Sequence, residues 1–177
     1  MQIPKILNIG CGSRKVKDEL NLDINPKMNP DIVMDISKVS FGKKVLSEKY
    51  GEIEIKEEMF DEIHADHVLE HIPDIVSTMW NCYKLLKWDG VMKITVPYDL
   101  SYGAWQDPTH VRAFNQHSWK YWCMPWCKQQ LAWEEGFSTK PDSIILEMHE
   151  EMTFDLAVRT PRAIEQMQVT LYKTKKI

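Results

Sequence analysis

The chain has 177 residues, enough for one domain and too few for a second full one, so we expect a single domain over residues 1–177. Its composition, 44% hydrophobic and 27% charged residues, is that of an ordinary soluble globular protein, and no stretch approaches the roughly 20 apolar residues that span a membrane. The net charge of −4 gives no general attraction to nucleic acids, so neither a membrane nor a nucleic acid is an expected partner.

Two further features of the sequence bear on the cellular location. The start "MQIPKILNIG" has one lysine and a very short apolar run, unlike a signal peptide. The four cysteines are scattered and mostly lie in apolar sequence, which suits a reducing compartment better than a disulfide framework. Together these features predict a cytoplasmic protein.

Apolar runs rich in Ile, Val and Leu recur through the first half of the chain and are typical of strands buried on both faces. We expect strands over residues 5–9, 20–24, 31–36, 62–66 and 91–96. Between the last two, apolar residues from Ile72 to Leu86 recur at spacings of three and four, which predicts a helix that tolerates Pro73 in its first turn and ends before "KWDG". This strand–helix–strand unit should be right-handed, with parallel strands.

The connections and the C-terminal part depart from a regular alternation. Only residues 10–19 separate the first two expected strands, which is short for a helical crossover of about a dozen residues, so the first helix must be stunted. Ser118 could cap a helix running toward Glu135, which Pro125 should kink or split. Residues 143–148 form a further strand candidate, and "EQMQVTLYK" alternates apolar and polar residues like an antiparallel strand added to a parallel sheet. The whole pattern predicts an α/β fold, a three-layer sandwich.

Ligands of open parallel sheets bind beyond the carboxyl ends of the strands, where this sequence places glycines and acids. Gly10 and Gly12 would let the backbone approach a ligand closely, or would only form a bend. Asp23 could accept two hydrogens from a ribose diol, or be a turn residue. Asp35 could accept from an exocyclic amine beside the apolar Ile36, or cap a helix.

Spacing distinguishes between kinds of cofactor. A dinucleotide site uses a G-x-G-x-x-G turn, a helix start facing the pyrophosphate and an acidic residue about 20 positions on. Here the third glycine is missing, the first helix is stunted, and Asp23 comes only thirteen residues after Gly10. A nucleoside cofactor without phosphates therefore fits better than a dinucleotide.

Five segments, "LNIGCGSRK", "LNLDINP", "DIVMDI", "FDEIHADHVLEHIPD" and "LLKWDGVMKITVP", resemble in order the motifs of class I S-adenosylmethionine-dependent methyltransferases, most closely small type-11-like ones. The resemblance covers about residues 3 to 97 and implies a Rossmann-like, mostly parallel seven-stranded sheet with an antiparallel end, with S-adenosyl-L-methionine as cofactor. Asn8 stands where many relatives carry an acid. The implied cofactor-binding residues are Asn8, Gly10, Cys11, Gly12, Asp23, Ile24, Asp35, Ile36, Ala65, Asp66 and His67.

Residues 97–135 form an aromatic-rich segment that follows the fifth expected strand and should face the acceptor. His110 has a ring suited to act as a base at neutral pH, Asp107 could orient it, and Arg112 could hold an anionic group of the acceptor. Alternatively, Asp107 forms a turn with Pro108 and Arg112 makes a structural ion pair. Some relatives show a similar D-P-x-H-x-R-x-F run, which favours a catalytic role. The acceptor would be a small molecule, a sugar or a nucleotide-like compound.

A metal site is not expected. The three histidines of residues 64–71 are unlikely to share a face, because strand alternation and a turn separate them, and Cys123 with Cys127 makes only a faint zinc pattern. Two alternative functions stay open: a non-catalytic S-adenosylmethionine-binding module, and a nicotinamide-dependent oxidoreductase.

Overall fold

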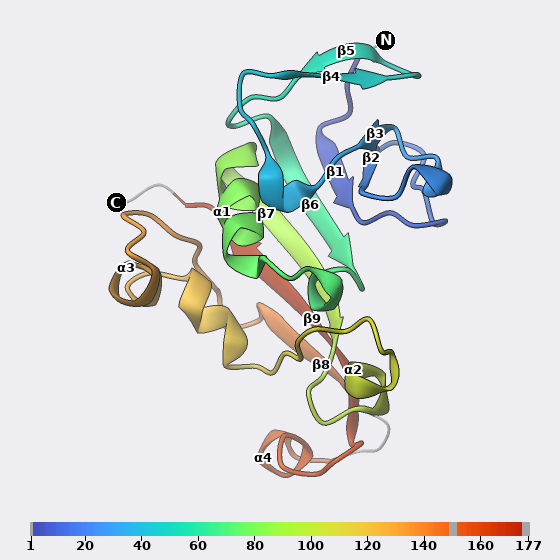
Figure 1. Cartoon of the computed structure of the whole chain (residues 1–177). Coiled ribbons are helices and arrows are strands. Elements are labelled where there is room, and N and C mark those ends of the chain that lie inside the picture. Colours follow the sequence, from blue (N-terminus) through green and yellow to red (C-terminus); the bar gives the residue numbers. More distant parts are fainter. Residues whose placement is uncertain (1, 149–151, 175–177) are drawn as a thin grey trace.

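The computed structural model describes residues 2–148 and 152–174, which form a seven-stranded sheet and a separate two-stranded hairpin (Figure 1). The order of strands in the main sheet is β3-β2-β1-β6-β7-β9-β8. Those strands are β1 (Ile6–Ile9), β2 (Leu20–Asp23), β3 (Ile32–Val33), β6 (Phe60–Asp66), β7 (Leu86–Pro97), β8 (Ile144–Met148) and β9 (Ile164–Tyr172).

The topology confirms the α/β class and the mostly parallel sheet. Strands β3, β2, β1, β6 and β7 run parallel to one another, whereas β9 pairs antiparallel with both β7 and β8. The chain crosses from β3 back to β6 on the other side of β1, so the strand order reverses beside β1. This reversal opens a crevice at the carboxyl end of β1, where the glycine turn lies.

Helix α1 (Ile75–Leu85) is the predicted helix, but it begins three residues later than the apolar pattern does. Asp74 is its N-cap and accepts a hydrogen bond from the backbone N–H of Ser77, which leaves Ile72 and Pro73 outside the helix. The chain passes directly from α1 into β7, so "KWDG" is an irregularity inside that strand, with Asp89 at φ 65°. The buried face of α1 covers the sheet.

The remaining helices are short. Pro125 splits the helix expected from Ser118 onward, and Ser118 lies inside the first piece instead of capping it. The short helices are the 3₁₀ helices η1 (Pro26–Met28), η2 (Ile36–Lys38), η3 (Leu69–His71) and η4 (Ser118–Trp122), and the α-helices α2 (Tyr102–Gln106), α3 (Trp126–Leu131) and α4 (Phe154–Ala157).

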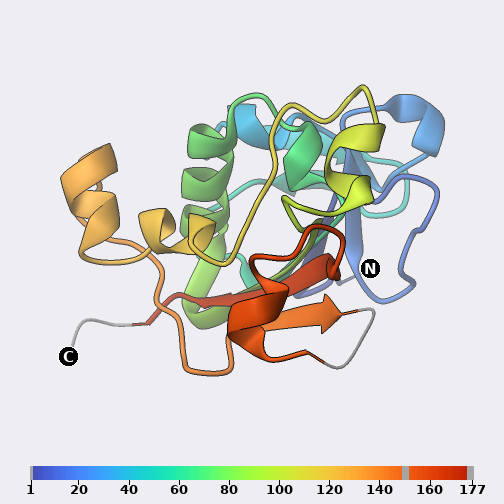
Figure 2. The ribbon, with the colours of Figure 1, turned by 90° about the horizontal axis from the view of Figure 1, so that it is seen from below.

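One face of the sheet is apolar and the other is polar. Helix α1 packs on the apolar face, as the view along the sheet shows (Figure 2). On the opposite face, alternate residues of the central strands, among them His64, Lys93 and Thr170, line a shallow depression of about 480 Å³. The expected second outer layer is therefore thin over this part of the sheet.

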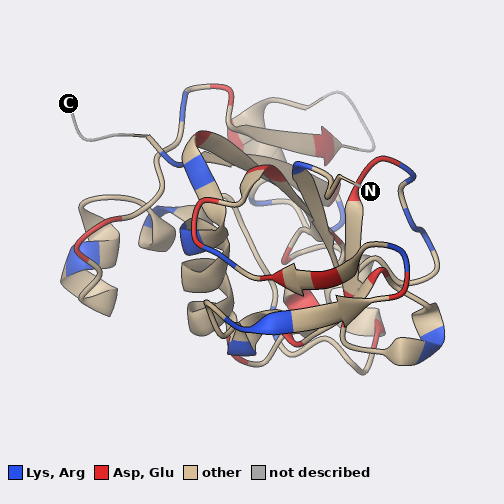
Figure 3. Ribbon diagram, turned by 90° about the horizontal axis from the view of Figure 1, so that it is seen from above, with Lys and Arg blue, Asp and Glu red and all other residues tan. Residues whose placement is uncertain are grey.

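The hairpin of β4 (Lys44–Ser47) and β5 (Gly51–Glu54) was not expected from the sequence. Its two strands carry charges of opposite sign, seen from above in Figure 3, and Lys44 pairs with Glu52 across the hairpin at 2.8 Å. Ile53 is the residue that β5 buries, so the hairpin is attached through one apolar face. In the described part of the chain, no helix is long and apolar enough to cross a membrane.

Candidate active site

The glycine turn at the end of β1 needs both glycines. Gly10 and Gly12 have φ of +63° and +51°, in the region that favours glycine. A Cβ at Gly10 would overlap the side chain of Val68, whereas one at Gly12 would meet no atom within 4 Å. The turn is thus packed tightly against the η3 segment on one side and open on the other.

Asp23, at the end of β2, holds this turn in place. Its Oδ2 accepts a hydrogen bond from the N–H of Gly12 and its Oδ1 accepts one from the N–H of Asn25, both at 2.8 Å. The residue is 8% exposed. A carboxylate has about four lone-pair sites, so two remain for a ligand. Asp23 is therefore a turn residue, as one alternative proposed, and still has acceptor capacity toward the crevice.

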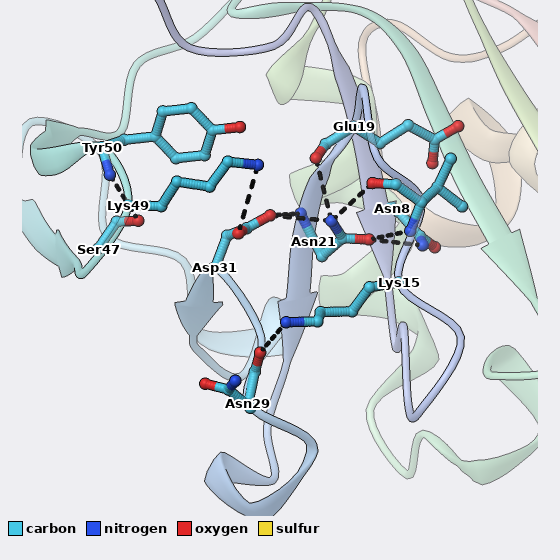
Figure 4. A network of polar contacts seen from close by, with 10 residues as sticks. Asn8, Lys15, Glu19, Asn21, Asn29, Asp31, Ser47, Lys49 and Tyr50 are labelled. Atoms are coloured by element: carbon cyan, nitrogen blue, oxygen red, sulfur yellow. Dashed lines mark hydrogen bonds and ion pairs between the residues drawn. The ribbon is translucent and has the colours of Figure 1, made fainter. Parts of the chain in front are cut away.

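A polar network replaces the missing first helix in residues 10–19 (Figure 4). The Oδ1 of Asn21 accepts from the N–H of Val16 at 2.8 Å and from Asn8 at 3.2 Å, and its Nδ2 donates to Asp31 at 2.9 Å. This confirms the stunted first connection. The Asn8 amide is engaged here, where many relatives carry an acid.

The carboxyl edge of the sheet holds a cavity of about 450 Å³ next to the turn. This volume is within the range of about 300–1,000 Å³ that small-molecule sites occupy. Asp23 lies in its wall, and Ile24, 66% exposed, supplies an apolar surface that the protein itself does not cover. Six of the predicted cofactor residues line this cavity: Gly10, Asp23, Ile24, Asp35, Ile36 and His67.

The other predicted cofactor residues lie around the turn. Asn8, Cys11 and Asp66 line a second hollow of about 290 Å³, which Gly10 joins to the first. Ala65 is buried in β6, beside Asp66. Burial raises the pKa of the Cys11 thiol to about 11, with the nearby Asp23 carboxylate adding to the effect, so this cysteine is a packing residue.

Asp35 caps η2, as the structural alternative proposed. Its Oδ1 accepts hydrogen bonds from the N–H of Ser37 at 3.0 Å and from the hydroxyl of Ser37 at 2.7 Å. Burial alone would raise the pKa of Asp35, but the hydrogen bonds from Ser37 and Lys38 outweigh it and lower the pKa. The next residue, Ile36, is fixed by its carbonyl, which accepts from Asn81 of α1 at 2.9 Å.

A further cavity of about 390 Å³ adjoins the first and is built from the η3 and α2 segments. His67 and His71 line both cavities, so the two cavities adjoin at these two side chains. The predicted Asp107 and His110 line this cavity of about 390 Å³, together with the buried Glu70.

His67 links the two cavities and has an unusual backbone, with φ 50°. Its Nε2 pairs with Oε1 of Gln166 at 2.9 Å, and its Nδ1 lies 3.5 Å from Oε1 of Glu70. The Glu70 carboxylate raises the pKa of His67, although burial opposes the effect.

His110 is oriented by a backbone carbonyl, and this corrects the pairing expected from the sequence. Its Nδ1 hydrogen bonds to the carbonyl of Ala104 at 3.0 Å. Asp107 instead accepts from the hydroxyl of Thr109 at 2.7 Å, and Thr109 in turn pairs with Nδ1 of His71 at 2.9 Å. Asp107 is therefore linked through Thr109 to the ring of His71, and not to His110.

Arg112 is used within the structure. Its Nη2 donates to the carbonyls of Ile72 and Pro73, both at 2.7 Å, and ties the acceptor-side segment to the start of α1. Burial lowers its pKa. These bonds to carbonyls are not the ion pair that the alternative proposed, and the contact with an anionic acceptor stays a prediction.

Sequence reasoning missed two residues that shape the site, Val68 and Gln166. Val68 lies within the quoted segment "FDEIHADHVLEHIPD", so its packing against Gly10 could have been sought there. Gln166 belongs to β9, and only the antiparallel pairing of that strand brings it to His67. Of the tryptophans in residues 97–135, Trp119, Trp122 and Trp133 are core residues.

The seven-stranded sheet with its antiparallel end, and the cavity over a glycine turn and Asp23, form the Rossmann-like arrangement expected from the resemblance to class I methyltransferases. Residues 7–94 match the family described as a methyltransferase domain. No curated protein matches the chain. We therefore assign residues 7–94 to a methyltransferase domain.

Solved structures share this fold. A SAM-dependent methyltransferase from Archaeoglobus fulgidus is 16% identical, with a TM-score of 0.63 over 97% of this chain and 86% of that one. A possible histamine N-methyltransferase from Thermotoga maritima is 11% identical, with a TM-score of 0.59 over 98% and 84%. The identification favours an enzyme over a non-catalytic module or an oxidoreductase.

Proposed function

We propose that the enzyme methylates a small-molecule, sugar or nucleotide-like acceptor bound in the cavity that His110 lines. The observation that carries this proposal is the wall that the cofactor and acceptor cavities share, formed by His67 and His71. Methyl transfer is an in-line displacement, so the acceptor atom must come within about 3 Å of the methyl carbon. Two adjoining cavities support the proposal, because ligands bound in them would be neighbours.

The residues of the first cavity fit a nucleoside cofactor without phosphates. The free lone pairs of Asp23 suit a ribose diol, and the uncovered side chain of Ile24 suits an apolar ring face. The glycine turn is packed closely on the side of Gly10, and its other side is open to a ligand. When bound, S-adenosylmethionine supplies the electrophilic methyl group.

The acceptor-side residues act on the other reactant. With Nδ1 of His110 donating to Ala104, its Nε2 can take a proton from an acceptor hydroxyl. Asp107 positions His71 through Thr109, and Arg112 holds the segment against α1. We further propose that residues 1–177 act as one domain in the cytoplasm, which four free, buried cysteines support.

Two measurements test this function. In calorimetric titration, the folded chain should bind S-adenosylhomocysteine, and Asp23→Ala should weaken the binding. Turnover on a panel of sugars, nucleotides and hydroxylated small molecules should be lost in His110→Ala while cofactor binding persists. Absence of cofactor binding by the folded chain would contradict the proposal, and so would full turnover by His110→Ala.

A further inference from the structure

The acceptor cavity contains a buried carboxylate that lacks hydrogen bonds. Glu70 is 1% exposed, and neither of its carboxylate oxygens has a hydrogen-bond partner in residues 2–148 and 152–174. The charged form of a buried carboxylate is unfavourable unless donors or a cation compensate it. The ion pair with His67, at 3.5 Å, is long for a hydrogen bond. The Glu70 carboxylate is therefore not fully compensated by the described residues.

Two imidazoles lie beside this carboxylate. Glu70, His71 and His110 each offer one ligand atom, and these atoms all lie within 4.8 Å of one another. The rings of His71 and His110 meet edge to face, with centroids 4.5 Å apart. All three residues line the acceptor cavity, so a ligand bound among them could also contact the acceptor.

In both rings Nδ1 already makes a hydrogen bond, which leaves Nε2 available for a ligand. Nδ1 of His110 donates to the Ala104 carbonyl, which places the lone pair of the neutral ring on Nε2. Nδ1 of His71 donates to the hydroxyl of Thr109, which donates to Asp107. Metal-binding histidines usually donate their second N–H to a carbonyl or toward a carboxylate in this way.

We propose that Glu70, His71 and His110 bind a first-row divalent transition-metal ion. Two imidazoles and one carboxylate suit such ions and leave coordination positions open to the cavity. Mg²⁺ and Ca²⁺ prefer sites built from oxygen ligands. An acceptor hydroxyl in an open position would lose its proton more readily. His110 would then serve as a metal ligand, and the metal ion would replace it as the group that favours deprotonation.

Calorimetric titration of the chelator-treated full chain with Zn²⁺ tests the site. We expect one Zn²⁺ per chain, bound at least ten-fold more tightly than Mg²⁺. His71→Ala and His110→Ala should each weaken Zn²⁺ binding at least ten-fold, and Glu70→Gln tests the third ligand with little change of shape. His117→Ala is the matched control, because this exposed histidine is outside the cluster, and it should bind Zn²⁺ like the wild type.

Thermal unfolding gives a second readout, since an ion that binds only the folded state raises the melting temperature. Zn²⁺ should raise the melting temperature of the wild type and of His117→Ala, and not that of His110→Ala. Folded wild type that binds no Zn²⁺, or His71→Ala and His110→Ala variants that bind Zn²⁺ as tightly as the wild type, would overturn the site and leave His67 as the partner of Glu70. Cofactor titration is independent, so failure of the metal site and failure of the proposed methyl transfer are distinguishable.

Discussion

Gly10→Ala probes how tightly the glycine turn is packed. Alanine in the left-handed region costs about 1–2 kcal/mol. The new Cβ would also overlap Val68, and overpacking typically adds about 1–3 kcal/mol. We therefore expect the free energy of unfolding to fall by about 2–5 kcal/mol, a large part of the stability of a chain of this size.

Gly12→Ala is the matched control for this substitution. Its φ is also positive, but the added Cβ would meet no atom within 4 Å, so only the backbone strain of about 1–2 kcal/mol applies. Urea unfolding followed by circular dichroism measures both variants, with equal m-values as the check that the comparison is valid.

Val68→Ala tests whether overlap with Val68 adds to the backbone strain of Gly10→Ala. Val68→Ala removes the Cγ2 that the new Cβ would meet but keeps the Cβ of residue 68 at 2.7 Å. The double variant Gly10→Ala/Val68→Ala should therefore recover only part of the overpacking cost, and be more stable than the sum of the single effects by about 1 kcal/mol. The reasoning is refuted if the two glycine variants lose equal stability and the effects of Gly10→Ala and Val68→Ala simply add.

Three further predictions concern other parts of the molecule. Ile24→Ser should weaken S-adenosylhomocysteine binding about five-fold with little change in melting temperature, because the side chain is exposed. Leu46→Ser, at a 77% exposed position on β4, is the control and should change neither quantity. Calorimetry measures the binding and thermal unfolding measures the melting temperature. Cys11, with its pKa raised to about 11 by burial, should resist iodoacetamide at pH 8 in the folded chain and react after unfolding, as mass spectrometry of the labelled peptide would show. Hydrogen bonds from Lys93 and His64 lower the pKa of Glu62, so its contribution is present above the unfolded pKa of about 4.3 and is lost as the pH falls through the folded pKa. Glu62→Gln should therefore be less stable than the wild type at pH 7, by under about 1 kcal/mol, and equal to it at pH 2 in urea unfolding.

The sheet could be predicted because its strands are apolar and its turns carry glycine and aspartate. The hairpin β4–β5 could not, since its strands are short and highly charged, and β5 buries only Ile53. The thin layer over the polar face of the sheet could have been predicted from the alternation of polar and buried residues in β7. In "MKITV" of β7, Lys93 and Thr95 alternate with buried residues, which is typical of a strand covered on one face.

The cofactor side of the candidate site was easier to predict than the acceptor side, for a physical reason. The cofactor residues follow consecutive strand ends, which topology alone brings together. The acceptor residues depend on how residues 98–116 fold back, and a hydrogen bond from the N–H of Val111 to the carbonyl of Glu70 fixes that path. No periodicity in the sequence indicates such a contact, so the sequence paired His110 with the neighbouring Asp107 instead of the carbonyl of Ala104.

The polar network around Asn21 makes the cofactor end of the molecule cooperative. One side chain joins residues 10–19, the end of β1 and the segment before β3 through Val16, Asn8 and Asp31. Loss of any one contact leaves buried polar groups of the others unsatisfied, so these segments are expected to open together and not one by one. Amide hydrogens across all three segments should then exchange with solvent with one common free energy of opening, although they are far apart in the chain.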